Sequence, residues 1–237
     1  MLKIIEWIML FFLHSLNSYE YWGCPANHQI SACLHGKNGN ASTKHKSIPT
    51  QETSETYGEC LQYKDNSCCT AEFTQQLIGP NITIIDDGDA GKFDWSTCGV
   101  LSDECEAFFV DIECFYRCSP NIAFFSGDFI SSLDKVPLCS SFCNDWYNAC
   151  KTDTTCVKNW VFGDWNWTSG VNTCPDGSTC NTFESVYGDP QTLCNTLWGN
   201  SFQYTQDTQA CLTPREASNN KAIVEYIFED CNVNGTD

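Results

Sequence analysis

The sequence predicts one disulfide-rich domain built from several helices, a short strand and long loops. Three observations support this prediction. The chain has 237 residues, enough to bury a core. Eighteen of them are cysteines, an even number close to the level that marks a disulfide scaffold. Apolar residues recur at helical spacing in several segments. No internal repeat or linker interrupts residues 19–237, so we expect a single domain there.

The start of the chain indicates a secretory signal over residues 1–18, with Lys3, an apolar run and then small polar residues. The run is short and no second one follows, so a membrane anchor is not expected. The far end has no hydrophobic tail, which argues against a lipid anchor there. Four N-x-Ser/Thr acceptors also favour export, and each is a predicted glycosylation site: Asn40, Asn81, Asn166 and Asn234. We therefore expect a secreted, extracellular protein.

Charge and residue types exclude several functions. The net charge is −18, which argues against binding nucleic acid or anionic membranes, since both need basic patches. Paired cysteines could hold zinc, but an oxidising compartment makes them disulfides, and no metal is expected. The histidines of the mature chain, His28, His35 and His45, lie in a polar arm away from the aromatic segments. An enzyme is therefore not expected, although a carboxylate pair stays open as an alternative.

The first part of the chain is mostly irregular. Residues 19–59 are polar and are expected to form an arm held only where it is cross-linked. The segment 66–78 predicts a short helix capped by Asn66 or Ser67. Residues 79–91 bracket a few β-branched residues with turn formers, which predicts a brief strand and a loop.

A longer helix is predicted over 102–118, capped by Ser102 or Asp103. Its inner face would hold every third or fourth residue: Cys105, Phe109, Ile112 and Tyr116. Pro120 and Gly127 break the pattern in the following segment.

The segment 136–150, VPLCSSFCNDWYNAC, predicts the central helix, with Pro137 in its first turn. Four residues share one face at helical spacing: Cys139, Cys143, Trp146 and Cys150. A helix with three half-cystines on its buried side can be joined to three other segments.

Beyond this helix, residues 156–174 are rich in tryptophan and predict a loop closed by its terminal cysteines. A compact helix is predicted over 189–200, with Asp189 as cap, Pro190 as first residue and Gly199 as stop. The last helix is predicted over 213–230, where Thr213 and Glu216 match a capping box.

Several of these segments are similar to the signature blocks of the folate receptor and riboflavin-binding protein family. The blocks are CFYRCSPN (114–121), VPLCSSFCNDWYNAC (136–150), NWVFGDWNWTSG (159–170) and LCNTLWGNSF (193–202). The resemblance runs from about Cys33 to Cys211. It implies an α+β fold, with helices, short strands and long loops around an open ligand pocket.

The resemblance also implies a set of disulfides: Cys33–Cys68, Cys60–Cys114, Cys69–Cys118, Cys98–Cys180, Cys105–Cys150, Cys139–Cys211, Cys143–Cys194 and Cys156–Cys174. Cys24 and Cys231 have no counterpart in the family pattern. We pair them by elimination, as a hypothesis.

A planar vitamin ring needs flat apolar walls and a few polar groups at its edge. The resemblance to the riboflavin-binding branch places a ring sandwich on Tyr116 and Trp198, and Ser201 matches a ring-edge hydrogen-bonding position of the folate branch. It also implies further wall residues: Trp160, Trp165, Trp167, Phe93 and Trp95. The alternative is that these aromatic residues belong to an ordinary core.

Departures from the folate pattern favour riboflavin or a related flavin as the carried ligand, with folate second. Folate receptors hold the pterin with an Asp where this chain has Ile112, flanked by Asp111 and Glu113, which are expected to point elsewhere. Residues 119–136 contain no Arg to meet the glutamate tail, and Val161 stands where the family has a pocket His. Against this, WNWTSG (165–170) resembles the folate branch.

The expected partner is thus a small-molecule vitamin, with no cofactor beyond it. An uptake receptor is a further candidate partner, and we expect a monomer. A third hypothesis is a recognition protein that kept the scaffold and lost vitamin binding.

Overall fold

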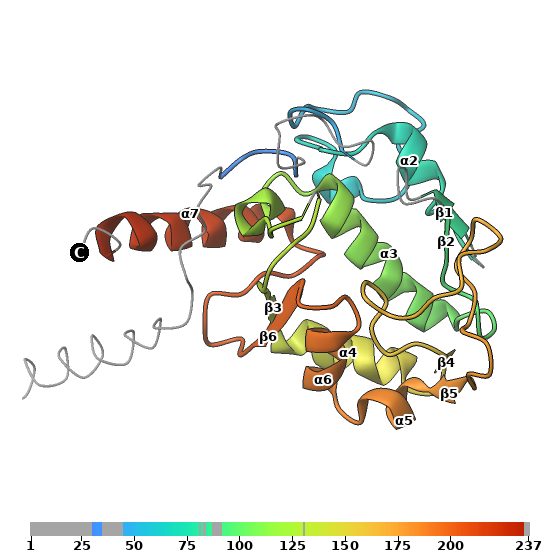
Figure 1. Ribbon diagram of the computed structural model, residues 1–237. Helices are drawn as coiled ribbons and strands as arrows, with labels where there is room; N and C mark the ends of the chain where they lie inside the picture. Colours follow the sequence, from blue (N-terminus) through green and yellow to red (C-terminus); the bar gives the residue numbers. More distant parts are fainter. Residues whose placement is uncertain are drawn as a thin grey trace, which may run out of the picture.

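The computed structural model describes residues 30–34, 45–80, 82, 84–86, 92–129 and 131–234. The predicted signal segment lies outside these ranges, as do Cys24 and the predicted glycosylation sites Asn40 and Asn81. The described chain is an α+β domain of helices, short two-stranded sheets and long loops (Figure 1). No helix in these ranges combines the length and the apolar character needed to cross a lipid bilayer.

Helix α3 (Asp103–Cys118) forms as predicted and runs through the middle of the domain (Figure 1). The side chain of Ser102 caps it by accepting a hydrogen bond from the Cys105 N–H at 3.3 Å. Phe109 and Ile112 on its inner face are buried, 0% and 2% exposed. The periodicity of the segment therefore identified the buried face correctly.

Helix α4 (Ser140–Cys150) is the predicted central helix, but it begins later than expected. Pro137 lies in strand β3 (Val136–Cys139), which pairs in parallel with β6 (Phe202–Thr205). Proline has no N–H to donate to a neighbouring strand, but its carbonyl accepts a hydrogen bond from the Leu212 N–H at 2.7 Å. The prediction of Pro137 as a helical residue was wrong because it pairs with Gln203, an extended partner 66 residues away in the sequence.

The segment 66–78 is also less helical than predicted. Helix α2 covers only Ala71–Gln75 and is capped by Thr70. Ser67 instead binds the buried hydroxyl of Tyr57 at 3.2 Å. Cys68 and Cys69 are bridged to different segments, to Cys33 and Cys118, which holds this stretch out of a helix.

Short sheets and helices complete the middle of the chain. Strands β1 (Ile84–Asp86) and β2 (Lys92–Asp94) pair antiparallel, which includes the predicted brief strand. Strands β4 (Thr154–Thr155) and β5 (Asn181–Thr182) form a second small pair. Two 3-10 turns, η1 (Leu61–Tyr63) and η3 (Ile122–Phe125), and helix α5 (Phe183–Tyr187) are further elements that the sequence analysis did not predict.

Helix α6 (Pro190–Thr196) has the predicted start, since Asp189 accepts a hydrogen bond from the Thr192 N–H at 2.7 Å. Helix α7 (Ala217–Asn234) extends away from the body of the domain (Figure 1). The predicted capping box does not form at its start. Instead, the side chain of Asn220 in the helix binds the backbone of Thr213 just before it. It accepts a hydrogen bond from the Thr213 N–H at 2.9 Å and donates one to the Thr213 carbonyl at 2.7 Å.

Eight disulfides join described residues, and each has the pairing that the family resemblance implies: Cys33–Cys68, Cys60–Cys114, Cys69–Cys118, Cys98–Cys180, Cys105–Cys150, Cys139–Cys211, Cys143–Cys194 and Cys156–Cys174. The central segment is thereby joined to three others through Cys139, Cys143 and Cys150. The predicted Cys24–Cys231 pair involves a residue outside the described ranges and stays a prediction.

Candidate ligand-binding site

A cavity of about 350 Å³ opens beside helix α3 and is the candidate site. This volume lies within the range of small-molecule pockets. Half of the lining residues are aromatic: Phe93, Tyr116, Phe129, Trp160, Phe162, Trp167, Trp198 and Phe202. The other half are mostly aliphatic or hydroxyl-bearing: Ile85, Ile112, Glu113, Ser131, Ser132, Leu133, Val161 and Ser201. The walls are therefore flat and apolar, with a few polar groups.

Helix α3 supplies one side of the cavity through Ile112, Glu113 and Tyr116. The expectation that Glu113 points elsewhere was wrong, because Glu113 lines the cavity and is 8% exposed. Its carboxylate accepts a hydrogen bond from Arg117 Nε at 3.2 Å, one helical turn later. Arg117 is 3% exposed and lies over the ring of Phe73 at 4.7 Å, so this buried charge pair is held inside the protein.

Tyr116 is fixed from two directions. Its hydroxyl donates a hydrogen bond to the Ser131 carbonyl at 2.7 Å. On another side the ring of His45 meets it edge-on, with centroids 5.2 Å apart. The expectation that no histidine lies near the aromatic segments was therefore wrong. His45 is far away in sequence, but it is only 6% exposed and packs beside Tyr116.

Trp198 approaches the cavity from the turn after α6 and has its own aromatic neighbours. Its ring centroid lies 5.6 Å from that of Trp160 and 6.1 Å from that of Phe93. Gly199 follows it with a φ of 66°, a conformation that glycine adopts easily. A β-carbon at this position would lie 2.9 Å from the ring of Phe162, so the glycine also lets that ring pack closely.

The loop 156–174 forms another wall, and the Cys156–Cys174 disulfide closes it as predicted from the sequence. Trp160 is its buried anchor, 3% exposed and stacked on Phe109 at 5.1 Å. Phe162 and Trp167 lie at the mouth of the cavity, 61% and 42% exposed.

Two predicted wall residues do not line the cavity. Trp95 is 1% exposed and packs on Phe109 at 5.5 Å, so it belongs to the core behind the wall. Trp165 is 8% exposed and meets Phe93 edge-on at 5.8 Å, which supports a lining residue without reaching the cavity. For these two tryptophans, the alternative of ordinary core residues holds.

The turn between Ser126 and Leu133 was not predicted as part of the site, yet it contributes Phe129, Ser131, Ser132 and Leu133 to the cavity. Backbone hydrogen bonds close it, with the Gly127 N–H donating to the Ser132 carbonyl at 2.8 Å. The break at Gly127 marked an irregular segment but gave no indication that it faces a ligand site.

Ser201 lies in the wall next to the stacking candidates. Its N–H donates to the Trp198 carbonyl at 3.1 Å, and its carbonyl accepts from the Val136 N–H at 2.8 Å. Its backbone is therefore held by the start of the β3–β6 pair. Its side chain stays a predicted ring-edge partner.

The cavity wall is nearly uncharged. Among the described residues that line it, Glu113 is the one ionisable side chain at neutral pH, and none is Lys, Arg or His. The predicted glycosylation site Asn166 lies close to this wall in sequence. Its side-chain oxygen accepts from the Thr168 hydroxyl at 2.6 Å, within the same acceptor motif.

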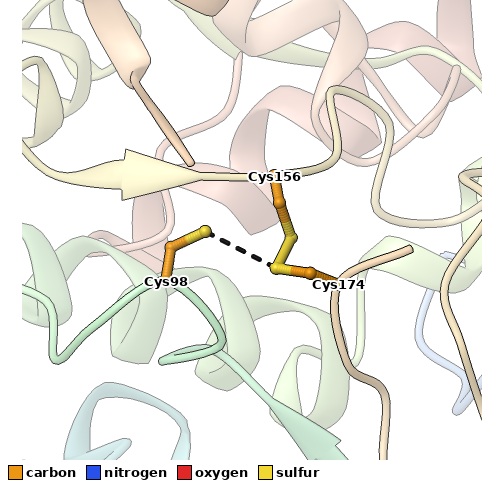
Figure 2. Close-up of side chains that lie close together, drawn as sticks. All are labelled: Cys98, Cys156 and Cys174. Carbon is orange, nitrogen blue, oxygen red and sulfur yellow. Dashed lines mark hydrogen bonds between the residues drawn. A yellow bond between two sulfur atoms is a disulfide. The ribbon is translucent and has the colours of Figure 1, made fainter. Parts of the chain in front are cut away.

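Three sulfur atoms lie close together at the base of the loop 156–174: those of Cys98, Cys156 and Cys174 (Figure 2). They lie within 4.8 Å of one another, and Cys98 Sγ is 3.6 Å from Cys174 Sγ. Each of them already belongs to a disulfide, so none is a thiolate that could ligate zinc. The group is a contact between two bridges that fixes the base of the loop.

Comparisons with known proteins agree with these features. The sequence model of the Folate receptor family matches residues 32–213. The chain is 39% identical over 183 residues to a riboflavin-binding protein of Dromaius novaehollandiae, covering 76% of this chain and 70% of that protein. It is 37% identical over 195 residues to folate receptor gamma of Homo sapiens, covering 77% and 72%. It is 38% identical over 186 residues to a riboflavin-binding protein of Gallus gallus, covering 78% and 71%.

Proposed function

Because the chain belongs to the folate receptor family, we propose that it is a secreted, monomeric protein that binds and carries riboflavin or a related flavin. It acts by binding rather than by catalysis. The observation that carries this proposal is the composition of the cavity: eight aromatic residues, one acid and no base among the described lining residues. Such a wall suits a flat, uncharged ring system.

The stacking residues are Tyr116 and Trp198. They line the same cavity from different elements. His45 and Ser131 orient the phenol of Tyr116. Trp160 and Phe93 orient the indole of Trp198. A ring inserted between them gains about 0.5–1.5 kcal/mol per aromatic contact beyond area burial. Trp160, Trp167 and Phe93 complete the wall, and Ser201 reaches the ring edge.

Charge separates the two vitamins. Folate ends in a dianionic glutamate tail, and burying or approaching such a tail requires nearby cations. The described cavity lining provides a carboxylate, Glu113, and no cation, within a chain of net charge −18. The tail of riboflavin is neutral and polyhydroxylated, so it meets no such penalty.

Folate remains the second candidate because folate receptor gamma is a similar relative and the segment 165–170 resembles the folate branch. A recognition protein without a ligand is less favoured, since a cavity of about 350 Å³ is retained.

The test is to secrete the full chain from cultured cells, remove bound ligand at low pH, and titrate it separately with riboflavin and folate. Stacking on Trp198 and Tyr116 quenches flavin fluorescence and protein tryptophan emission, so both signals are followed. We expect saturable quenching by riboflavin and at least 100-fold weaker binding of folate. Tighter binding of folate would overturn the choice of vitamin, and no response to either would overturn vitamin carriage. Size-exclusion chromatography of a thiol-blocked sample tests the proposed monomeric state.

A further inference from the structure

Ser131 combines three unusual features in one cavity-lining residue. It is 8% exposed. Its hydroxyl oxygen is buried with no hydrogen-bond partner among the described residues. Its backbone has a φ of 56°, in the left-handed region that a serine seldom adopts.

A buried hydroxyl without a partner loses its hydrogen bonds to water and gains nothing in return. Such groups are rare in folded proteins, and each calls for an explanation. Backbone strain of this kind persists where the surrounding structure enforces it, and it concentrates at ligand-binding sites. At Ser131 the two features coincide on the wall of the cavity, so a bound ligand is a natural partner for the hydroxyl.

The position of Ser131 indicates which part of the ligand it meets. Its carbonyl accepts the hydrogen bond from the Tyr116 hydroxyl at 2.7 Å, so it lies beyond the tip of the phenol rather than above its face. Phe129, two residues earlier in the same turn, is 69% exposed at the mouth of the cavity. Ser131 therefore lies between the stacking ring and the solvent, where a substituent of the stacked ring would leave the protein.

The described part of the same turn offers no positive charge to an anionic substituent. The neighbouring hydroxyl, Ser132, already accepts from the Phe129 N–H at 2.9 Å, and no basic side chain in the described part of the turn faces the cavity. Trp198 adds a second buried polar atom without a described partner, its indole Nε1. A hydroxyl group can both donate and accept, so one hydroxylated tail can satisfy such neutral groups.

We infer that Ser131 is a ligand-binding residue whose hydroxyl hydrogen-bonds the neutral hydroxylated tail of the ligand, while its carbonyl orients Tyr116. This inference rests on the proposed function and adds to it the group that distinguishes a polyol tail from an anionic one.

The test compares Ser131→Gly with the unmodified protein. Glycine adopts the same backbone conformation without strain and retains the carbonyl, so the CH2OH side chain is lost while the acceptor for Tyr116 is kept. Lys135→Gly is the matched control, because Lys135 also has a left-handed backbone, with a φ of 48°, but does not line the cavity. Two probes are titrated: riboflavin, and lumiflavin, which has the same ring with a methyl group in place of the tail.

For Ser131→Gly we expect about a 3- to 10-fold loss of riboflavin affinity, the size of one neutral hydrogen bond, with lumiflavin affinity maintained and the melting temperature not lowered. Lys135→Gly should bind both probes as the unmodified protein does. Unchanged riboflavin affinity in Ser131→Gly would overturn the inference alone. Equal losses for both probes would place the contact on the ring and overturn the assignment to the tail. No riboflavin binding by the unmodified protein would overturn the proposed function and this inference together.

Discussion

The Cys156–Cys174 disulfide closes the loop that carries a quarter of the cavity lining: Trp160, Val161, Phe162 and Trp167. Replacing both cysteines by serine removes this closure without leaving a free thiol. The loop stays attached at its buried anchor, because Trp160 packs in the core and its N–H donates to the Leu197 carbonyl at 2.7 Å. The exposed part of the wall loses its covalent restraint.

The size of the effect follows from the sequence separation of 18 residues. Loop-closure entropy gives a loss of about 3.2 kcal/mol in the free energy of unfolding. This value is an upper limit, because the other disulfides already restrict the unfolded chain. If the whole free-energy cost of ordering the loop is instead incurred when the ligand binds, riboflavin affinity falls by at most about 200-fold. We expect at least a tenfold loss.

Cys33–Cys68 provides the matched control. Its separation of 35 residues gives about 3.8 kcal/mol by the same relation, and no described cavity-lining residue lies between the two cysteines. Urea unfolding and riboflavin titration are measured on both double variants. The control should lose stability but lose much less affinity than the Cys156–Cys174 variant, because the segment it releases contacts the cavity only indirectly, through His45 packed on Tyr116. If the Cys156–Cys174 variant keeps its full affinity, the loop is not a restrained wall of the site and the reasoning fails.

Trp198→Ala should weaken riboflavin binding at least tenfold in a fluorescence titration, because Trp198 lines the cavity. Trp95→Phe should lower the melting temperature and leave riboflavin affinity unchanged, because Trp95 lies in the core. Equal losses of affinity in the two variants would contradict this prediction. Gly199→Ala should weaken binding by about tenfold, since its methyl group would displace the Phe162 ring at 2.9 Å and strain a φ of 66°; an unchanged dissociation constant would argue against it. Burial raises the pKa of Asp111 in the folded protein, so this residue contributes fully to the free energy of unfolding below about pH 3.8, and that contribution is lost as the pH rises through the folded-state pKa. Asp111→Asn lacks this titration, so its stability in urea unfolding should rise relative to that of the unmodified protein between pH 3.5 and pH 7. A stability difference that stays constant over this pH range would contradict the prediction. Riboflavin affinity should fall between pH 7.4 and pH 5, because protonation changes the charge balance of a chain of net charge −18, and equal affinities would refute that expectation.

Local patterns were enough to predict much of the scaffold. Helix α3 begins at the predicted cap because Ser102 satisfies an N–H that the helix itself leaves open. Helix α6 likewise begins at Asp189 and Pro190. The tryptophan-rich loop and its closing cysteines were also visible as a segment without helical or alternating period. In each case the determining interactions join residues close in sequence.

Long-range packing decided the rest. Pro137 became a strand residue because Phe202–Thr205 offers it a parallel partner. Trp95 and Trp198 are chemically the same, and only the arrangement of the elements puts one in the core and the other on the cavity. His45 reached Tyr116 from a distant polar segment for the same reason.

By itself the sequence determined the cross-linked class of the protein, its main helices and the supply of aromatic rings, since these depend on composition and on short-range periodicity. Only the tertiary structure decided which rings and hydroxyls share a cavity. Glu113 and Ser131 became wall residues through the packing of α3 against a turn that has no regular period, and a pattern within one segment cannot encode which distant segment will face it.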